Sequence, residues 1–160
     1  TGEFVVNLMS EWYVEAANYT CGEYERGVNE MHKAGLTPLQ SHKVRPPRVA
    51  ESAVQMECKL RQVVEFSDKA GTPTSCVVLG EVVMFHVHEE VSERTPTGKV
   101  VVDPVKLRPV SRLGGVVYGR TGELYELPRP NPDGSFPNLI TKAMIKDKQE
   151  EEEGGSRLAN

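Results

Sequence analysis

Hydrophobic and polar residues alternate most regularly near the middle of the chain. The apolar members of this pattern are Val54, Met56, Cys58 and Leu60. A period of two predicts a strand with one buried face. The alternation changes phase at residues 61–62, before a second apolar group at 63–66. An extra residue at that point favours a β-bulge.

The most apolar stretch covers residues 76–87, and both of its faces are apolar except at Glu81. Such a stretch is typical of a central strand, and we expect it to bend at Gly80. Shorter extended segments are expected at residues 4–8 and 100–102, which are rich in β-branched side chains.

The helices are expected to be short and to lie between these strands. Ser10 is a suitable N-cap for a helix over residues 11–18. The buried face of that helix would contain Trp12, Ala16 and Tyr19. Asn29 is expected to cap a second helix, and Asp103 followed by Pro104 predicts a single helical turn.

Several short antiparallel strands with little helix predict a mainly β (α+β) fold, a small Greek-key barrel with short inserted helices. A doubly wound sheet is disfavoured because strands do not alternate with long helices, and no GxGxxG motif follows a strand. The domain is expected over residues 1–130. A linker and an acidic tail follow over 131–160, and the tail is expected to be disordered.

Charge and composition exclude two classes of partner. The chain has 160 residues and a net charge of −4. Residues 147–160 hold five acids, one Lys and one Arg, which gives −3 and leaves −1 for residues 1–146. No basic face for nucleic acid is therefore expected. No apolar run reaches membrane-spanning length, and no signal peptide is expected.

The three cysteines bear on the compartment of the protein. Cys58 and Cys76 lie in apolar strand patterns, so we expect both to be buried hydrophobic residues. An odd number of cysteines used in this way is typical of a reducing compartment, and we expect a cytoplasmic protein.

One stretch near the end of the domain has the composition of a loop that approaches a flat ligand. Gly114 and Gly115 lack side chains where the backbone would have to come close. Tyr118 offers a ring for stacking, and Arg112 and Arg120 offer planar cationic groups on either side. The alternative is a glycine turn between two antiparallel strands with solvated arginines, and composition favours that alternative.

Other groups of polar residues give weaker evidence for a metal, anion or catalytic site. His86 and His88 share a strand face, but a third metal ligand at a standard spacing is missing, and we expect a polar strand end. Lys43, Arg45 and Arg48 form a basic loop, either a solvated surface or a grip on a phosphate or a nicotinamide dinucleotide. No catalytic residue can be named from the sequence, and an enzyme of this kind would depend on a cofactor.

The order of four segments resembles the flavin reductase-like family, which has an FMN-binding split barrel, and within it the flavoredoxin-like branch. The segments are TGEFVVNLMSEWYVEAAN, GVNEMHKAGLTPLQSHKVRPPRVAESAVQMECKL, VVLGEVVMFHV and VVDPVKLRPVSRLGGVVYGRTGELYELPRP. The resemblance implies a split antiparallel barrel that forms a homodimer, with FMN near the subunit interface. It runs from residue 1 to about residue 130.

The resemblance also implies a function. Members of the family bind FMN, commonly reduce it with NADH or NADPH, and often deliver reduced flavin to a partner monooxygenase. We therefore expect an NAD(P)H:FMN oxidoreductase. Two alternatives stay open: a non-catalytic flavin-binding electron carrier, and a truncated remnant that acts only as an interaction protein.

The resemblance marks six positions as FMN-binding. They are Asn7, Ser10, Arg112, Gly114, Gly115 and Tyr118. Some branches of the family carry a His where this chain has Ser75. The main FMN-phosphate contacts of the family come from a segment before the TGEF strand, so the domain is expected to be N-terminally incomplete.

Overall fold

The computed structural model describes residues 1–125, 127 and 129–135. The chain divides into two compact units, Thr1–Gly122 and Glu123–Asn160. In the second unit, Asp133 Oδ1 accepts a hydrogen bond from the backbone N–H of Ser135 at 2.9 Å, within a turn. The expected acidic tail lies outside the described residues. Within the described part of the chain, no helix is long and apolar enough to cross a membrane.

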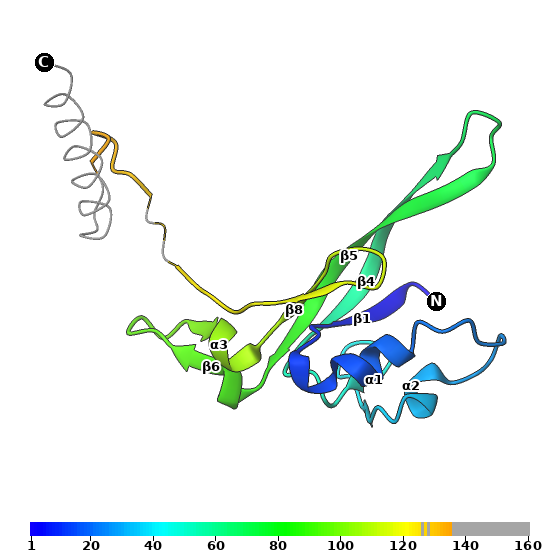
Figure 1. Ribbon diagram of the computed structural model, residues 1–160, viewed down its shortest axis with the longest axis horizontal. Coiled ribbons are helices and arrows are strands. Elements are labelled where there is room, and N and C mark those ends of the chain that lie inside the picture. Colours follow the sequence, from blue (N-terminus) through cyan, green and yellow to red (C-terminus); the bar gives the residue numbers. More distant parts are fainter. Residues whose placement is uncertain (126, 128, 136–160) are drawn as a thin grey trace, which may run out of the picture. The chain divides into compact units, whose positions relative to one another are not determined.

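A three-stranded antiparallel sheet in the order β1-β4-β5 forms the frame of the first unit (Figure 1). The three strands are β1 (Glu3–Asn7), β4 (Val54–Ser67) and β5 (Pro73–Val87). β1 pairs only with the first part of β4, from Asn7 opposite Gln55 to Glu3 opposite Lys59. The hairpin turn between β4 and β5 is closed by Asp68, whose Oδ1 accepts the N–H groups of residues 70 and 72.

The sheet confirms one strand prediction and corrects another. The pairing of β4 with β5 shifts register between Leu60 and Gln62, where the sequence predicts a bulge. The prediction that residues 76–87 form a central strand is wrong. They belong to β5, which lies at the edge of the described sheet, and β4 is central. Gly80 on β5 allows close packing, because a Cβ there would overlap Cζ of Phe4 on β1.

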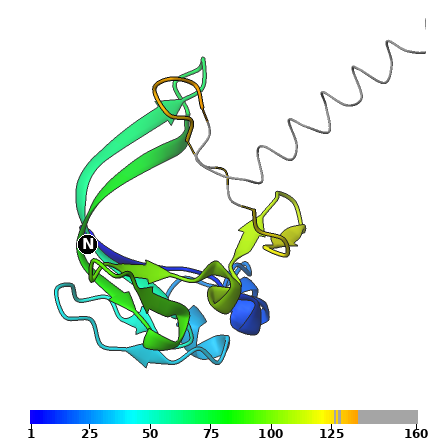
Figure 2. The ribbon, with the colours of Figure 1, turned by 90° about the vertical axis from the view of Figure 1, so that its left-hand side faces the viewer.

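Beyond β1, the β4/β5 hairpin continues as an arm formed by residues 62–79, which projects away from the other elements of its unit (Figures 1 and 2). Large exposed apolar residues of the arm are Val63, Val64, Phe66, Val77, Val78 and Leu79. Cys76 is exposed on this arm, which corrects its expected burial, whereas Cys58 is 3% exposed as expected.

Short helices and a two-stranded sheet lie between β1 and β4. The elements are η1 (Glu11–Tyr13, a 3₁₀ turn), α1 (Val14–Tyr19), α2 (Glu30–Lys33), β2 (Pro38–Leu39) and β3 (Arg48–Val49). Tyr13, Leu36 and Val49 form the centre of the core here. The predicted burial of Trp12 and Tyr19 is wrong, because the 3₁₀ turn directs Tyr13 inward instead.

The chain after β5 forms two small hairpins and a helical turn. The elements are η2 (Glu89–Val91), β6 (Ser92–Arg94), β7 (Val100–Val102), α3 (Pro104–Leu107), β8 (Val110–Arg112) and β9 (Tyr118–Arg120). β6 pairs with β7, and β8 pairs with β9. Val54, Val91 and Leu107 form a second core.

Two of the three predicted helix caps are confirmed. Asn29 accepts a hydrogen bond from the backbone N–H of His32, and Asp103 accepts from the N–H groups of residues 105 and 106. The predicted role of Ser10 is wrong, because its side chain makes no capping hydrogen bond and is completely buried.

Candidate active-site cleft

A cleft of about 620 Å³ lies between the η1–α1 segment and the β8/β9 hairpin. Trp12, Val116 and Tyr118 contribute apolar or aromatic side chains to its lining. Charged side chains come from Glu11, Glu15, Arg108 and Arg120. The cleft thus combines two aromatic rings, which can stack on a flat organic ligand, with several charged groups beside them.

The backbone holds the two walls of the cleft together. Val110 N–H donates to the Met9 carbonyl at 3.1 Å, and Glu11 N–H donates to the Arg108 carbonyl at 3.0 Å. Between these bonds, Ser10 forms an isolated antiparallel bridge with Pro109. The bridge buries Ser10 completely, and its Oγ has no hydrogen-bond partner within the described residues.

Tyr118 links the two walls through its side chain. Its hydroxyl donates to Asn18 Oδ1 on α1 at 2.7 Å. Arg112 lies opposite Tyr118 in the β8/β9 register, and its guanidinium is 4.8 Å from the centre of the tyrosine ring. This cation–π contact and the hydrogen bond fix the orientation of the ring beside the cleft.

Three of the charged side chains that line the cleft are close to one another. Glu11 Oε2 lies 2.6 Å from Arg108 Nη2 and 3.5 Å from Arg120 Nε. One carboxylate therefore serves two guanidinium groups. A phosphate group would have to compete with Glu11 for these arginines, whereas a neutral ring system would not.

The glycine pair forms a tight turn. Gly114 and Gly115 have positive φ angles of 95° and 52°, and Val117 N–H donates to the Gly114 carbonyl at 3.0 Å. The turn joins β8 to β9, which is the alternative that composition favours. Neither glycine lines the cleft.

Asn7 lies apart from the cleft. Its Oδ1 accepts a hydrogen bond from the backbone N–H of Val49 at 3.0 Å, and it lines a separate cavity beside Tyr13. Of the six positions marked by the resemblance, only Tyr118 lines the cleft, while Ser10 bridges Pro109 and Arg112 contacts the Tyr118 ring. Trp12 and Asn18 were missed, because no local pattern sets them apart from ordinary helix residues.

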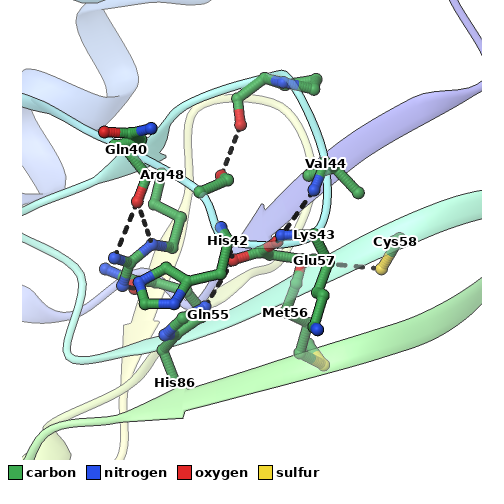
Figure 3. Close-up of polar contacts among 12 residues, drawn as sticks. Gln40, His42, Lys43, Val44, Arg48, Gln55, Met56, Glu57, Cys58 and His86 are labelled. Carbon is green, nitrogen blue, oxygen red and sulfur yellow. Dashed lines mark hydrogen bonds and ion pairs between the residues drawn. The ribbon is translucent and has the colours of Figure 1, made fainter.

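A buried carboxylate on β4 forms a second polar centre (Figure 3). Glu57 is completely buried and accepts hydrogen bonds from the backbone N–H groups of His42, Lys43 and Val44 at 2.5–3.1 Å. His86 Nε2 lies 2.6 Å from Glu57 Oε1.

Hydrogen bonding keeps this carboxylate ionised. Burial works to raise the pKa of Glu57, but the hydrogen bonds from the backbone of residues 42–44 and from His86 together lower its pKa to about 2. The residue was missed because it occupies a polar position of an alternating strand, which predicts exposure to solvent.

The predicted basic loop separates into three environments. The side chain of Arg45 is 78% exposed and pairs with Glu3 at 2.9 Å, and Lys43 is also exposed. Arg48 is only 8% exposed and donates from Nη1 to Gln55 Oε1 at 2.7 Å (Figure 3). Within the described residues, no group of three or more His, Cys, Asp or Glu residues could hold a metal ion.

Comparison with models of protein families shows to which family the chain belongs. Residues 1–105 match the family model described as the flavin reductase like domain. The chain belongs to this family. A protein of Halalkalibacterium halodurans is 37% identical over 129 residues, which are 81% of this chain and 59% of that relative. The chain thus spans about 60% of the length of the curated relatives it matches first.

Solved structures of flavin reductase-like and flavoredoxin proteins share this fold. Nitrilotriacetate monooxygenase component B from Bacillus cereus is 36% identical with a TM-score of 0.72, covering 79% of this chain and 60% of its own. Flavoredoxin of Desulfovibrio vulgaris is 26% identical with a TM-score of 0.61, covering 79% and 62%.

A third solved structure supports the barrel assignment. A Shewanella frigidimarina protein with a split barrel domain is 24% identical with a TM-score of 0.67, covering 81% of this chain and 61% of its own, and this likeness shows the fold alone. The predicted fold class, a mainly β split barrel with short helices, is therefore confirmed, as is the predicted flavin reductase-like family.

Proposed function

We propose that the full-length protein is an FMN-binding oxidoreductase that reduces flavin with NADH or NADPH. Membership of the flavin reductase-like family supports a flavin-related redox function. The observation that carries the proposal to this chain is the cleft in which Trp12 and Tyr118 lie beside two arginines.

The residues present fit the ring system of FMN better than its phosphate. Trp12 and Tyr118 offer aromatic faces against which a flat ring system can stack. Arg108 is paired with Glu11 at 2.6 Å, and Arg120 lies 3.5 Å from the same carboxylate, so a phosphate would compete with Glu11 for both.

Within this proposal, FMN supplies hydride chemistry between the nicotinamide and an acceptor. The task of the chain is to orient the flat ligands and to exclude water. Tyr118, fixed by Asn18 and Arg112, would present a ring edge to the bound rings. Trp12 would cover them from η1, with its indole N–H held by the Glu51 carbonyl at 2.8 Å.

A titration of the full-length protein with FMN, followed by visible absorbance, tests the proposal. We expect saturable binding, and Tyr118→Ala should weaken it about tenfold by loss of the aromatic contact. Val105→Ala is the matched control, because Val105 is exposed on α3 and does not line the cleft. Absence of FMN binding by the wild-type protein contradicts the proposal.

Consumption of NADH or NADPH in the presence of FMN tests the catalytic part. Steady consumption supports a flavin reductase. FMN binding without nicotinamide oxidation instead supports the electron-carrier alternative. A stable protein that never takes up FMN supports the alternative in which this domain acts only in protein interactions.

We further propose a homodimer and a partner monooxygenase for the full-length protein. The apolar arm supports the dimer, because an exposed apolar surface of this kind is typical of an interface. A related solved structure is component B of a monooxygenase, and this supports delivery of reduced flavin to an oxygenase.

A further inference from the structure

A second cavity, of about 400 Å³, contains a buried cation. Its polar lining side chains are Arg48, Ser52, Gln55, His86 and His88. It shares no lining residue with the cleft described above. Arg48 is more than nine-tenths buried, yet it borders this open space.

The hydrogen bonds of Arg48 use neutral acceptors. Nε and Nη2 both donate to the Gln40 carbonyl, at 3.3 and 3.0 Å, and Nη1 donates to Gln55 Oε1. Gln55 is itself fixed, because its Nε2 donates to the Val49 and Ser52 carbonyls at 2.7 Å. A guanidinium has five N–H groups. One N–H on each terminal nitrogen of Arg48 is therefore left without a partner in the described residues.

No carboxylate neutralises Arg48 within the described part of the chain. Glu57 makes no hydrogen bond to Arg48 in the described residues, and its oxygens already accept the N–H groups of the 42–44 loop and of His86. Glu90 lies 3.8 Å from His88, and both side chains are exposed. A buried charge without a counterion is costly, so a bound anion at Arg48 would be stabilised.

We propose that this cavity binds an oxyanion, the phosphate or carboxylate group of a small molecule, through the two open N–H groups of Arg48. A guanidinium offers such groups in a planar fork that matches both anions. His86 also lines the cavity, but its Nε2 is held by Glu57, so Arg48 is the residue that carries the anion contact. The inference does not depend on flavin binding at the cleft.

An NMR titration of the flavin-free, full-length protein tests this site. The probes are inorganic phosphate and acetate, with sodium chloride at matched ionic strength as the reference. We expect saturable shifts for the backbone amides of Ala50, Ala53 and Val87, which line the cavity. Saturation by either anion supports the site and identifies the preferred group. Shifts that do not saturate, or that spread over exposed cations, overturn it.

Two variants sharpen the experiment. Arg48→Lys keeps the positive charge but loses the fork, and it should weaken anion binding about tenfold or more. Arg45→Gln is the control, because it removes a charge from the same loop at an exposed position outside the cavity. If the two variants lose anion affinity to the same extent, the proposal is overturned. If Arg48→Lys does not fold, the titration of the wild-type protein tests the site by itself. Saturable shifts confined to the amides that line the cavity support it, and any other pattern overturns it.

Discussion

At the scale of single residues, Glu57 shows how a polar side chain can organise a buried region. Its carboxylate joins the loop at residues 42–44 to His86 on β5. Each of its oxygens accepts two hydrogen bonds, so the cost of removing the charge from water is offset by charged hydrogen bonds. The loop conformation therefore depends on one ionised group.

Glu57→Gln should lower the free energy of unfolding by about 2 kcal/mol or more. The amide keeps the shape of the side chain, but its NH₂ group would face backbone N–H donors. Urea denaturation measures the change. Glu65→Gln is the matched control, since Glu65 lies exposed on the same strand. Equal stability of the two variants would contradict the role assigned to Glu57.

The lowered pKa of Glu57 also predicts a pH dependence. Its folded-state pKa of about 2 is below the ordinary value of 4.5, so the unfolded chain binds the proton more tightly. The stabilisation is therefore complete above the ordinary value and is lost as the pH falls towards 2. Urea midpoints measured across this acidic range should fall less steeply for Glu57→Gln than for the wild-type protein, and parallel curves would argue against this prediction.

At the scale of elements, the contact between β1 and β5 depends on a residue without a side chain. The Phe4 ring of β1 lies over Gly80 of β5, across the central strand β4. The glycine thus allows close packing next to the register shift between Leu60 and Gln62.

Gly80→Ala should destabilise the sheet by about 1 kcal/mol, because the Phe4 ring must move aside for the new methyl group. Thermal unfolding followed by circular dichroism measures the effect. Gly122→Ala provides the comparison, since a Cβ there meets no atom within 4 Å. An unchanged melting temperature for Gly80→Ala would show that the ring moves without cost.

Local signals in the sequence predict local structure well. The bulge in β4 and the caps at Asn29 and Asp103 depend on neighbouring residues, and all three were predictable. The burial of Gln55 and Glu57 was not, because it depends on how the loop before β4 and His86 of β5 fold over the polar face of β4. The lining of the candidate cleft also depends on distant segments, because Trp12 on η1 lines it together with Tyr118 of β9.

At the scale of the whole molecule, the arm is an exposed apolar surface that a binding partner would cover. Both of its strands expose large apolar side chains, and such a surface is costly in water. The proposed homodimer would cover this surface.

Val78→Glu should weaken the proposed dimer at least tenfold, because it places a charge at an apolar position of the arm. Sedimentation velocity on the full-length protein measures the association. Lys69→Glu, a charge change in the turn at the end of the arm, serves as the control. A wild-type protein that stays monomeric would remove the basis of the prediction.

The hairpin connection between β4 and β5 also sets an expected order of folding. Residues near the turn, such as Phe66 and Ser75, pair across a short loop, whereas Phe4 pairs with Cys58 from a distant part of the chain. Closing a short loop costs less conformational entropy. The hairpin should therefore form early and β1 should join it late. Substitutions near the turn should slow refolding, and substitutions in β1 should mainly accelerate unfolding.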